Sequence, residues 1–202
     1  AQYTFWSASA MVFIVSIVLY LNLKKGTAEA TAKKDSYFST LKVAIKEAKN
    51  PRVALAYTAG IVSRGDLAVV STFFALWLGI EFQSLGMSKP EAQKMAALLY
   101  VAVQACAIPG ALLINFFIDK FDRVVALAIS MAIAATGYLY LGFIDDVTGY
   151  EMYIGVGLLG LGEIFANISA ISLIGTVAPP KARGAVIGGF SFFGAVGIFL
   201  VA

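Results

Sequence analysis

Three ionisable residues lie deep inside long apolar stretches of the sequence: Arg64, Asp66 and Glu163. An ionised side chain in the middle of a bilayer is costly unless it faces a cavity or a partner. A carboxylate there can bind a proton or a cationic solute group, while a guanidinium attracts an anion or tunes the pKa of the carboxylate. An interhelical ion pair that only fixes packing is the alternative. The residue types favour the binding role, because intramembrane ionisable groups usually line transport paths.

Two amides extend this set. Asn167 follows Glu163 by four residues, which puts both on one face of a helix, and Gln104 lies midway along another apolar stretch. They fit the wall of a polar cavity and interhelical hydrogen bonding about equally well. Arg64 and Asp66 are two residues apart, so we expect them to point to different faces and to meet different neighbours.

The residue inventory excludes several other kinds of chemistry. The chain has no histidine and one cysteine, Cys106, which rules out histidine-based catalysis, disulfide frameworks and cysteine-rich metal sites. The spacing Gly155-x-Gly157-x-x-Gly160 matches a dinucleotide-binding fingerprint by letter, but it lies in an apolar stretch without a preceding strand. We therefore expect no enzymatic activity, no cofactor, no metal and no nucleic-acid partner.

The elements that position these residues are membrane-spanning helices. Hydrophobic residues make up 60 % of the chain and charged residues 13 %, about half the usual charged share of a soluble domain. Six apolar segments are long enough to cross a bilayer, and we predict an all-α membrane protein, a polytopic helix bundle. The spans are residues 5–23, 53–80, 92–118, 124–144, 152–177 and 184–202. Arg64, Asp66 and Glu163 then lie near mid-depth.

The long polar stretch, residues 24–52, is basic. Apolar residues at helical spacing over 37–48 predict a short amphipathic helix on the membrane surface, with the lipid bilayer as its partner. Placing this linker in the cytoplasm puts the turns 119–123 and 179–183 on the same side. All Lys and Arg residues except Arg64, Lys89 and Lys94 then lie on the inner side, as the positive-inside rule requires. The last two spans are rich in glycine, and the GxxxG pair Gly184 and Gly188 predicts close helix packing.

Two turns carry a family resemblance. The run Asn115-Phe-Phe-Ile-Asp119-Lys120-Phe-Asp122-Arg123 resembles the signature loop of the major facilitator superfamily, with Asn115 and Asp122 in place of glycines. The run Pro179-Pro-Lys-Ala-Arg183-Gly184 is similar to the turn between the tenth and eleventh helices of that family. By this resemblance, residues 1–23 are the last helix of the amino-terminal half and 24–52 the central linker. Residues 53–202 are a truncated carboxy-terminal half with five spans.

The resemblance implies alternating access between two six-helix halves. The seventh and tenth helices, which would carry Arg64, Asp66 and Glu163, line the central cavity in that fold. Asp119, with Lys120 and Arg123 nearby, would latch one conformation against the missing amino-terminal half. Both ends of the chain look like cuts, and we interpret the sequence as a fragment.

We predict a secondary active transporter for a small solute, coupled to protons, in the bacterial inner membrane. Asp66 or Glu163 would be the protonation site, and Arg64 the substrate or pKa-tuning partner. The alternative is a non-transporting member of the fold that serves as a subunit or assembly factor of a larger membrane complex.

Overall fold

The computed structural model describes residues 2–22 and 37–201, and of residues 2–5, 7, 8, 19 and 22 it describes the backbone alone. The chain separates into two compact units, residues 1–36 and 37–202. In the first unit, helix α1 (Gln2–Asn22) covers the first predicted span, and its stretch Ser9–Val18 is apolar. The start of the predicted basic linker, residues 23–36, lies outside the described residues.

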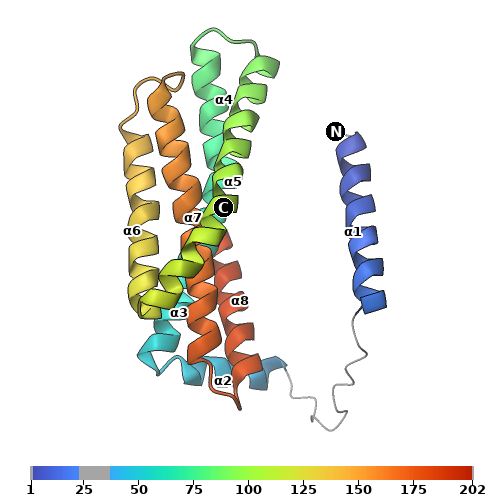
Figure 1. Ribbon diagram of the computed structural model, residues 1–202, viewed down its shortest axis with the longest axis vertical. Coiled ribbons are helices and arrows are strands. Elements are labelled where there is room, and N and C mark those ends of the chain that lie inside the picture. Colours follow the sequence, from blue (N-terminus) through green and yellow to red (C-terminus); the bar gives the residue numbers. More distant parts are fainter. Residues whose placement is uncertain (1, 23–36, 202) are drawn as a thin grey trace. The chain divides into compact units, whose positions relative to one another are not determined.

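The second unit is built from helices throughout its described residues (Figure 1). Five helical stretches in it are long and apolar enough to cross a membrane. The unit therefore confirms an all-α, polytopic membrane bundle. Its elements are α2 (Tyr37–Glu47), α3 (Pro51–Ala68), η1 (Val69–Phe74), α4 (Ala75–Ser84), α5 (Lys89–Lys120), α6 (Arg123–Gly142), α7 (Tyr150–Val177) and α8 (Arg183–Val201).

Local sequence signals explain where these helices begin. The side chain of Asn50 accepts a hydrogen bond from the Arg52 backbone N–H at 3.0 Å, and Pro51 occupies the first turn of α3. Ser88 and Glu91 form a capping box at the start of α5. Asp122 caps α6 by accepting from the Val124 N–H at 2.9 Å. Each cap satisfies backbone donors that the helix leaves free.

The predicted second span differs from a plain α-helix. Residues Pro51–Ser84 form one continuous helical stretch, but η1 within it is a π-helix. Such segments widen the helix by one residue per turn and occur often at functional sites. Here the π-helix begins three residues after Asp66 and leads directly into α4.

Helix α7 lies at the centre of the unit and packs against α3, α5 and α6. Small residues in α7 permit this close packing. A methyl group on Gly162 would clash with the Ala134 backbone of α6, and one on Gly160 would clash with the Val103 carbonyl of α5. Helices α5 and α6 therefore approach α7 closely, as glycine-rich membrane helices do.

The predicted packing role of Gly184 and Gly188 is wrong for the described part of the chain. A methyl group at either position would meet no described atom within 4 Å. The glycines of α8 that do contact neighbours are Gly189, Gly194 and Gly197, which face α2 or α3. The GxxxG spacing marks one helix face, and α8 is rotated so that a different face meets α3.

Two apolar clusters occupy opposite ends of the unit. One joins η1, α4 and the start of α7 through residues such as Phe74, Leu78 and Met152. The other joins the starts of α3 and α8 to the end of α7 through residues such as Val53, Leu173 and Phe190. On α7, and on the continuous helical stretch that begins with α3, the polar residues of interest lie between the parts of the helix that join the two clusters. The polar site therefore lies near the middle of these helices.

Candidate functional site: a polar cavity between three helices

Three helices enclose a small polar cavity of about 90 Å³. Helix α3 contributes Ser63, Arg64 and Leu67, α5 contributes Gln104 and Ala107, and α7 contributes Glu163, Ile164 and Asn167. Four of the five predicted binding residues therefore line one cavity: Arg64, Gln104, Glu163 and Asn167. The spacing on α7 accounts for two of them, because residues four apart share a helix face.

Glu163 is the most buried of the four predicted binding residues in the cavity, with 7 % of its surface exposed. Its Oε2 atom and the Oδ1 atom of Asn167 are buried and have no hydrogen-bond partner among the described residues. Buried polar groups in native proteins are usually paired, so two orphan acceptors on one cavity wall need an explanation. A bound proton, water or donor group of a solute would supply the missing hydrogen bonds.

Arg64 supplies positive charge to the same cavity. Its side chain forms no ion pair within the described part of the chain and is exposed. Its Cγ lies against Gly194 of α8, where a methyl group would clash with it. The missing side chain at Gly194 therefore makes room for the stem of Arg64 beside α8.

Asp66 does not line the cavity. Its carboxylate accepts a hydrogen bond from the hydroxyl of Tyr138 on α6. Residues two positions apart on a helix are about 200° apart around its axis, so Arg64 and Asp66 face different neighbours, as predicted. Asp66 and Tyr138 nevertheless lie near enough to Glu163 to interact with it electrostatically. The two carboxylates therefore belong to neighbouring parts of one polar region.

Sequence reasoning missed Tyr138. It lies in an apolar span without a polar pattern around it, and tyrosines are common in such spans. The only available signal was the general need of a buried phenol for a hydrogen-bond partner. That need does not identify the partner, which here is 72 residues away in the chain.

The predicted latch residues differ from one another. Asp119 and Lys120 are exposed and form no side-chain hydrogen bond or ion pair with any described residue. Arg123 instead donates from Nη1 to the Ser172 carbonyl at 3.2 Å and to the Ser172 hydroxyl at 2.5 Å, which ties α6 to α7. The latch role of Asp119 against the other half of the fold stays a prediction.

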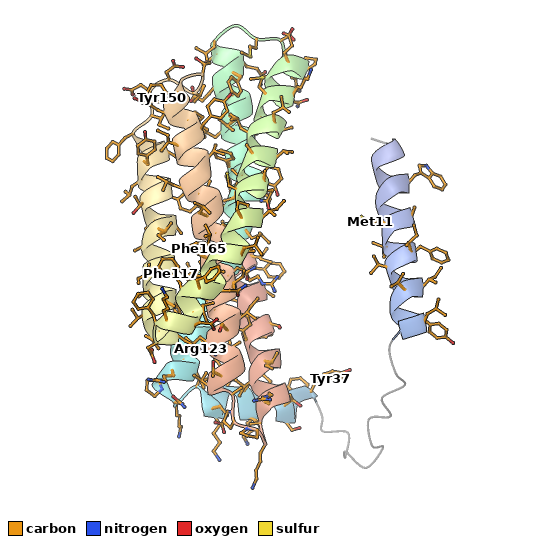
Figure 2. All side chains as sticks on the ribbon, viewed as in Figure 1. Met11, Tyr37, Phe117, Arg123, Tyr150 and Phe165 are labelled. Carbon is orange, nitrogen blue, oxygen red and sulfur yellow. The ribbon has the colours of Figure 1, made fainter. Side chains whose placement is uncertain are left out.

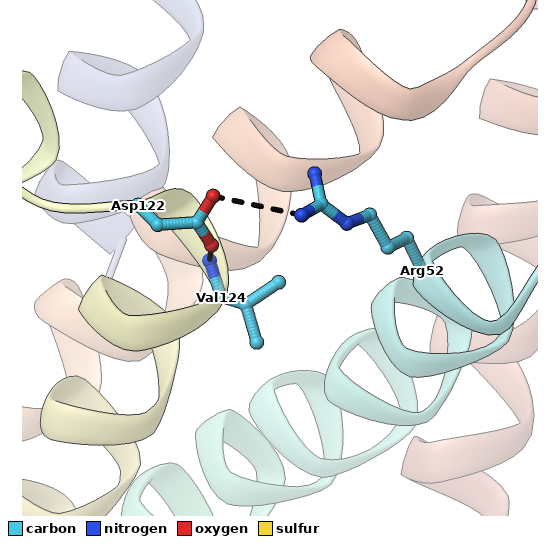
Figure 3. A network of polar contacts seen from close by, with 3 residues as sticks. All are labelled: Arg52, Asp122 and Val124. Carbon is cyan, nitrogen blue, oxygen red and sulfur yellow. Dashed lines mark hydrogen bonds and ion pairs between the residues drawn. The ribbon is translucent and has the colours of Figure 1, made fainter.

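Two further contacts hold the same end of the unit together. Phe117 of α5 packs against Phe165 of α7 with ring centroids 6.2 Å apart (both labelled in Figure 2). Asp122, which stands where the family pattern has glycine, forms an ion pair with Arg52 of α3 at 3.7 Å (Figure 3). The turn before α6 therefore contacts α3 through Asp122 and α7 through Arg123.

The described residues contain no group of three or more Cys, Asp and Glu side chains that could hold a metal ion. The polar cavity provides one carboxylate, amide oxygens and a guanidinium, which suit hydrogen bonding and charge pairing with a solute. A polar cavity among membrane-spanning helices is the arrangement of a transporter-like fold.

Comparison with known families agrees. The chain matches the Major Facilitator Superfamily over residues 1–202, and it belongs to that family. It is 25 % identical over 152 residues to the magnetosome protein MamZ of Magnetospirillum gryphiswaldense, which covers 75 % of this chain and 24 % of the relative. It is 26 % identical over 148 residues to the magnetosome protein MamH of Paramagnetospirillum magneticum, which covers 73 % of this chain and 34 % of the relative. The matches thus span about a quarter to a third of these relatives. No solved structure matches the chain.

Proposed function

We propose that the chain is part of a secondary active transporter that moves a small solute by alternating access and couples this movement to protons. The observation that carries the proposal is the Glu163 carboxylate. It is 7 % exposed, faces the polar cavity, and keeps one oxygen without a hydrogen-bond partner among the described residues. Groups of this kind within membrane helices usually belong to ion or solute paths.

In this proposal Glu163 binds the coupling proton. Arg64 attracts an anionic group of the solute, while Gln104 and Asn167 hydrogen-bond to it. Because α7 packs against α3 and α5, which line the rest of the cavity, a change in the charge or hydrogen bonding of Glu163 would act on both of them. Asp66, held by Tyr138, is the second candidate for the protonation site.

The rest of the site would come from the amino-terminal half of the same fold, in line with the fraction of the relatives that the chain covers. We place the protein in a bacterial inner membrane with the basic linker in the cytoplasm, by the positive-inside rule. The names of the relatives add the magnetosome as a second location for it.

The test is solute accumulation in proteoliposomes that contain the full-length protein, with a panel of small solutes and an imposed pH gradient. We expect gradient-driven accumulation by the wild type and none by Glu163→Gln, whereas Glu163→Gln should still exchange solute across the membrane. Persisting exchange would show that the variant is folded and has lost only the coupling.

The matched control is Asp145→Asn, which removes an exposed loop carboxylate and should leave accumulation unchanged. Accumulation by the wild type that ignores the pH gradient would contradict proton coupling. So would equal accumulation by Glu163→Gln.

A second candidate function is a non-transporting subunit or assembly factor of a larger membrane complex. Its support is that both groups of relatives carry the name of a compartment, the magnetosome, and not the name of a solute. Copurification with other membrane proteins in fixed stoichiometry, together with no movement of any solute in the panel, would favour it over transport.

A further inference from the structure

Helices α3 and α6 both pack against α7, and a groove runs between them along its side. A separate pocket of about 250 Å³ lies at the residues that precede this groove on both helices, and its polar lining consists of Arg52, Asp122, Arg123 and Thr176, beside apolar residues from the ends of α5 and α7. These residues come from the beginnings of α3 and α6 and from the end of α7. They therefore lie where the helices reach the boundary of the membrane.

The charges in this pocket favour an anion. Two guanidinium groups face one carboxylate, which leaves one positive charge in excess. The Arg52–Asp122 pair is 3.7 Å long and its side chains are 61 % and 52 % exposed, so the pair is weak and Arg52 is available to another anion. Arg123 uses Nη1 for Ser172, and no described residue accepts from its other terminal nitrogen.

One helical turn further along the same two helices, the lining becomes apolar. A second pocket of about 240 Å³ extends from Leu55 to Val62 on α3 and from Val124 to Met131 on α6. Each of these stretches is about 10 Å long. The hydroxyl of Thr58, which also lines this pocket, donates to its own helix at the Ala54 carbonyl at 3.0 Å. The remaining surface offers only apolar contacts.

We propose that this groove binds one anionic glycerophospholipid. Arg52 and Arg123 bind the phosphate at the membrane boundary, and an acyl chain lies between α3 and α6. The order of the lining, positive at the boundary and apolar one turn deeper, is the order of groups in such a lipid. The single excess positive charge matches the single negative charge of a phosphodiester. Basic pockets between membrane helices are known to bind anionic headgroups in this way.

The lipid would act as a spacer between α3, which carries Arg64 and Asp66, and α6, which carries Tyr138. These helices are joined across the groove by the Arg52–Asp122 pair at the boundary and by the Asp66–Tyr138 hydrogen bond deeper in the membrane. A bound acyl chain fills the space between these two links. This role is independent of whether the polar cavity transports a solute.

The test is native mass spectrometry of the full-length protein, released from nanodiscs that contain phosphatidylglycerol and phosphatidylcholine in equal amounts. We expect one retained phosphatidylglycerol. Arg52→Gln should reduce its retention about fivefold, because each basic residue near the headgroups contributes about 1 kcal/mol to lipid binding, which is about fivefold in the binding constant. Lys181→Gln removes an exposed charge outside the pocket and should leave retention unchanged.

Ala128→Phe provides a second variant that keeps both arginines. Ala128 lines the apolar pocket and is exposed, so a phenyl ring fills the groove without entering the core. It should reduce phosphatidylglycerol retention as Arg52→Gln does. Equal retention of both lipids by the wild type, or full retention of phosphatidylglycerol by both variants, would overturn the proposal.

A further arm separates a lipid from a free anion. Millimolar inorganic phosphate should not displace the retained phosphatidylglycerol, because phosphate makes no use of the apolar groove. Displacement by inorganic phosphate, together with unchanged retention in Ala128→Phe, would assign the pocket to a soluble phosphate and overturn the lipid assignment.

Discussion

The interior of the helical unit and its polar ends use the same residue types in opposite ways. At mid-span, Glu163 is buried and keeps an oxygen without a partner among the described residues. At the start of α6, Asp122 is half exposed, caps the helix and pairs with Arg52. A satisfied and exposed carboxylate contributes to local structure at little cost. A buried carboxylate that lacks a partner lowers stability, and the binding role proposed for Glu163 would explain why this cost is tolerated.

The largest expected change in the free energy of unfolding concerns the packing of Gly162, the neighbour of Glu163 in α7. Gly162→Ala should lower the free energy of unfolding by about 3 kcal/mol, because the added methyl group forces the α7 backbone away from Ala134 of α6. Gly157→Ala is the matched control, since a methyl group there meets no described atom within 4 Å. Unfolding in mixed detergent micelles measures both. A similar loss in the two variants would show that α6 and α7 are not in close contact.

Glu163→Leu should change the free energy of unfolding in the opposite direction. Removing the unpartnered carboxylate should raise the free energy of unfolding by about 2 kcal/mol while it abolishes proton-driven transport. Asp66→Leu is the counterpart, because it leaves the Tyr138 hydroxyl without its acceptor and should destabilise the protein by about 1–3 kcal/mol. If Glu163→Leu also destabilises the protein, then Glu163 has a structural partner and the contrast with Asp122 is lost.

Loss of the exposed Arg52–Asp122 ion pair should have only a small effect on stability. Asp122→Asn keeps an oxygen that can cap α6 but removes the charge facing Arg52, so stability should fall by less than about 1 kcal/mol. The difference should shrink further at high salt, because exposed charges are screened. Thermal unfolding at low and high ionic strength measures it. A loss that is larger and insensitive to salt would mean that the pair is effectively buried.

The smallest effect concerns the loop between α6 and α7. The Thr148 hydroxyl and backbone N–H donate to Oδ1 of Asp146 at 2.6 and 2.8 Å, and these hydrogen bonds lower the pKa of that carboxyl. A lowered folded-state pKa stabilises the fold above the ordinary carboxyl pKa, and this contribution is lost as pH falls through the lowered value. Thr148→Val should raise the pKa of Asp146 toward its ordinary range, as read by NMR titration of the carboxyl carbon. An unchanged pKa would assign the shift to the backbone donor alone.

Much of the fold followed from one-dimensional pattern. Apolar length predicted six spans, and the structure confirms five of them as helices long and apolar enough to cross a membrane. The turns predicted at 119–123 and 179–183 lie where α5 meets α6 and where α7 meets α8, although the first turn is shorter than predicted. The π-helix was not predictable in this way, because Val69–Phe74 contains no proline or glycine to mark it. The rotation of α8 was also missed, because a GxxxG spacing describes one helix and not the neighbour that it meets.

By itself the sequence determined which polar groups enter the membrane, since Arg64, Asp66, Gln104, Glu163 and Asn167 interrupt apolar stretches and the cost of burying them is independent of the fold. Helical periodicity further determined that Arg64 and Asp66 point apart. Only the tertiary structure decided that Glu163 faces Arg64 and Gln104 across a cavity, that Asp66 binds Tyr138, and that Asp122 pairs with Arg52. Partners on different helices depend on how each helix is rotated and how closely it packs, and those quantities come from contacts between side chains far apart in the chain.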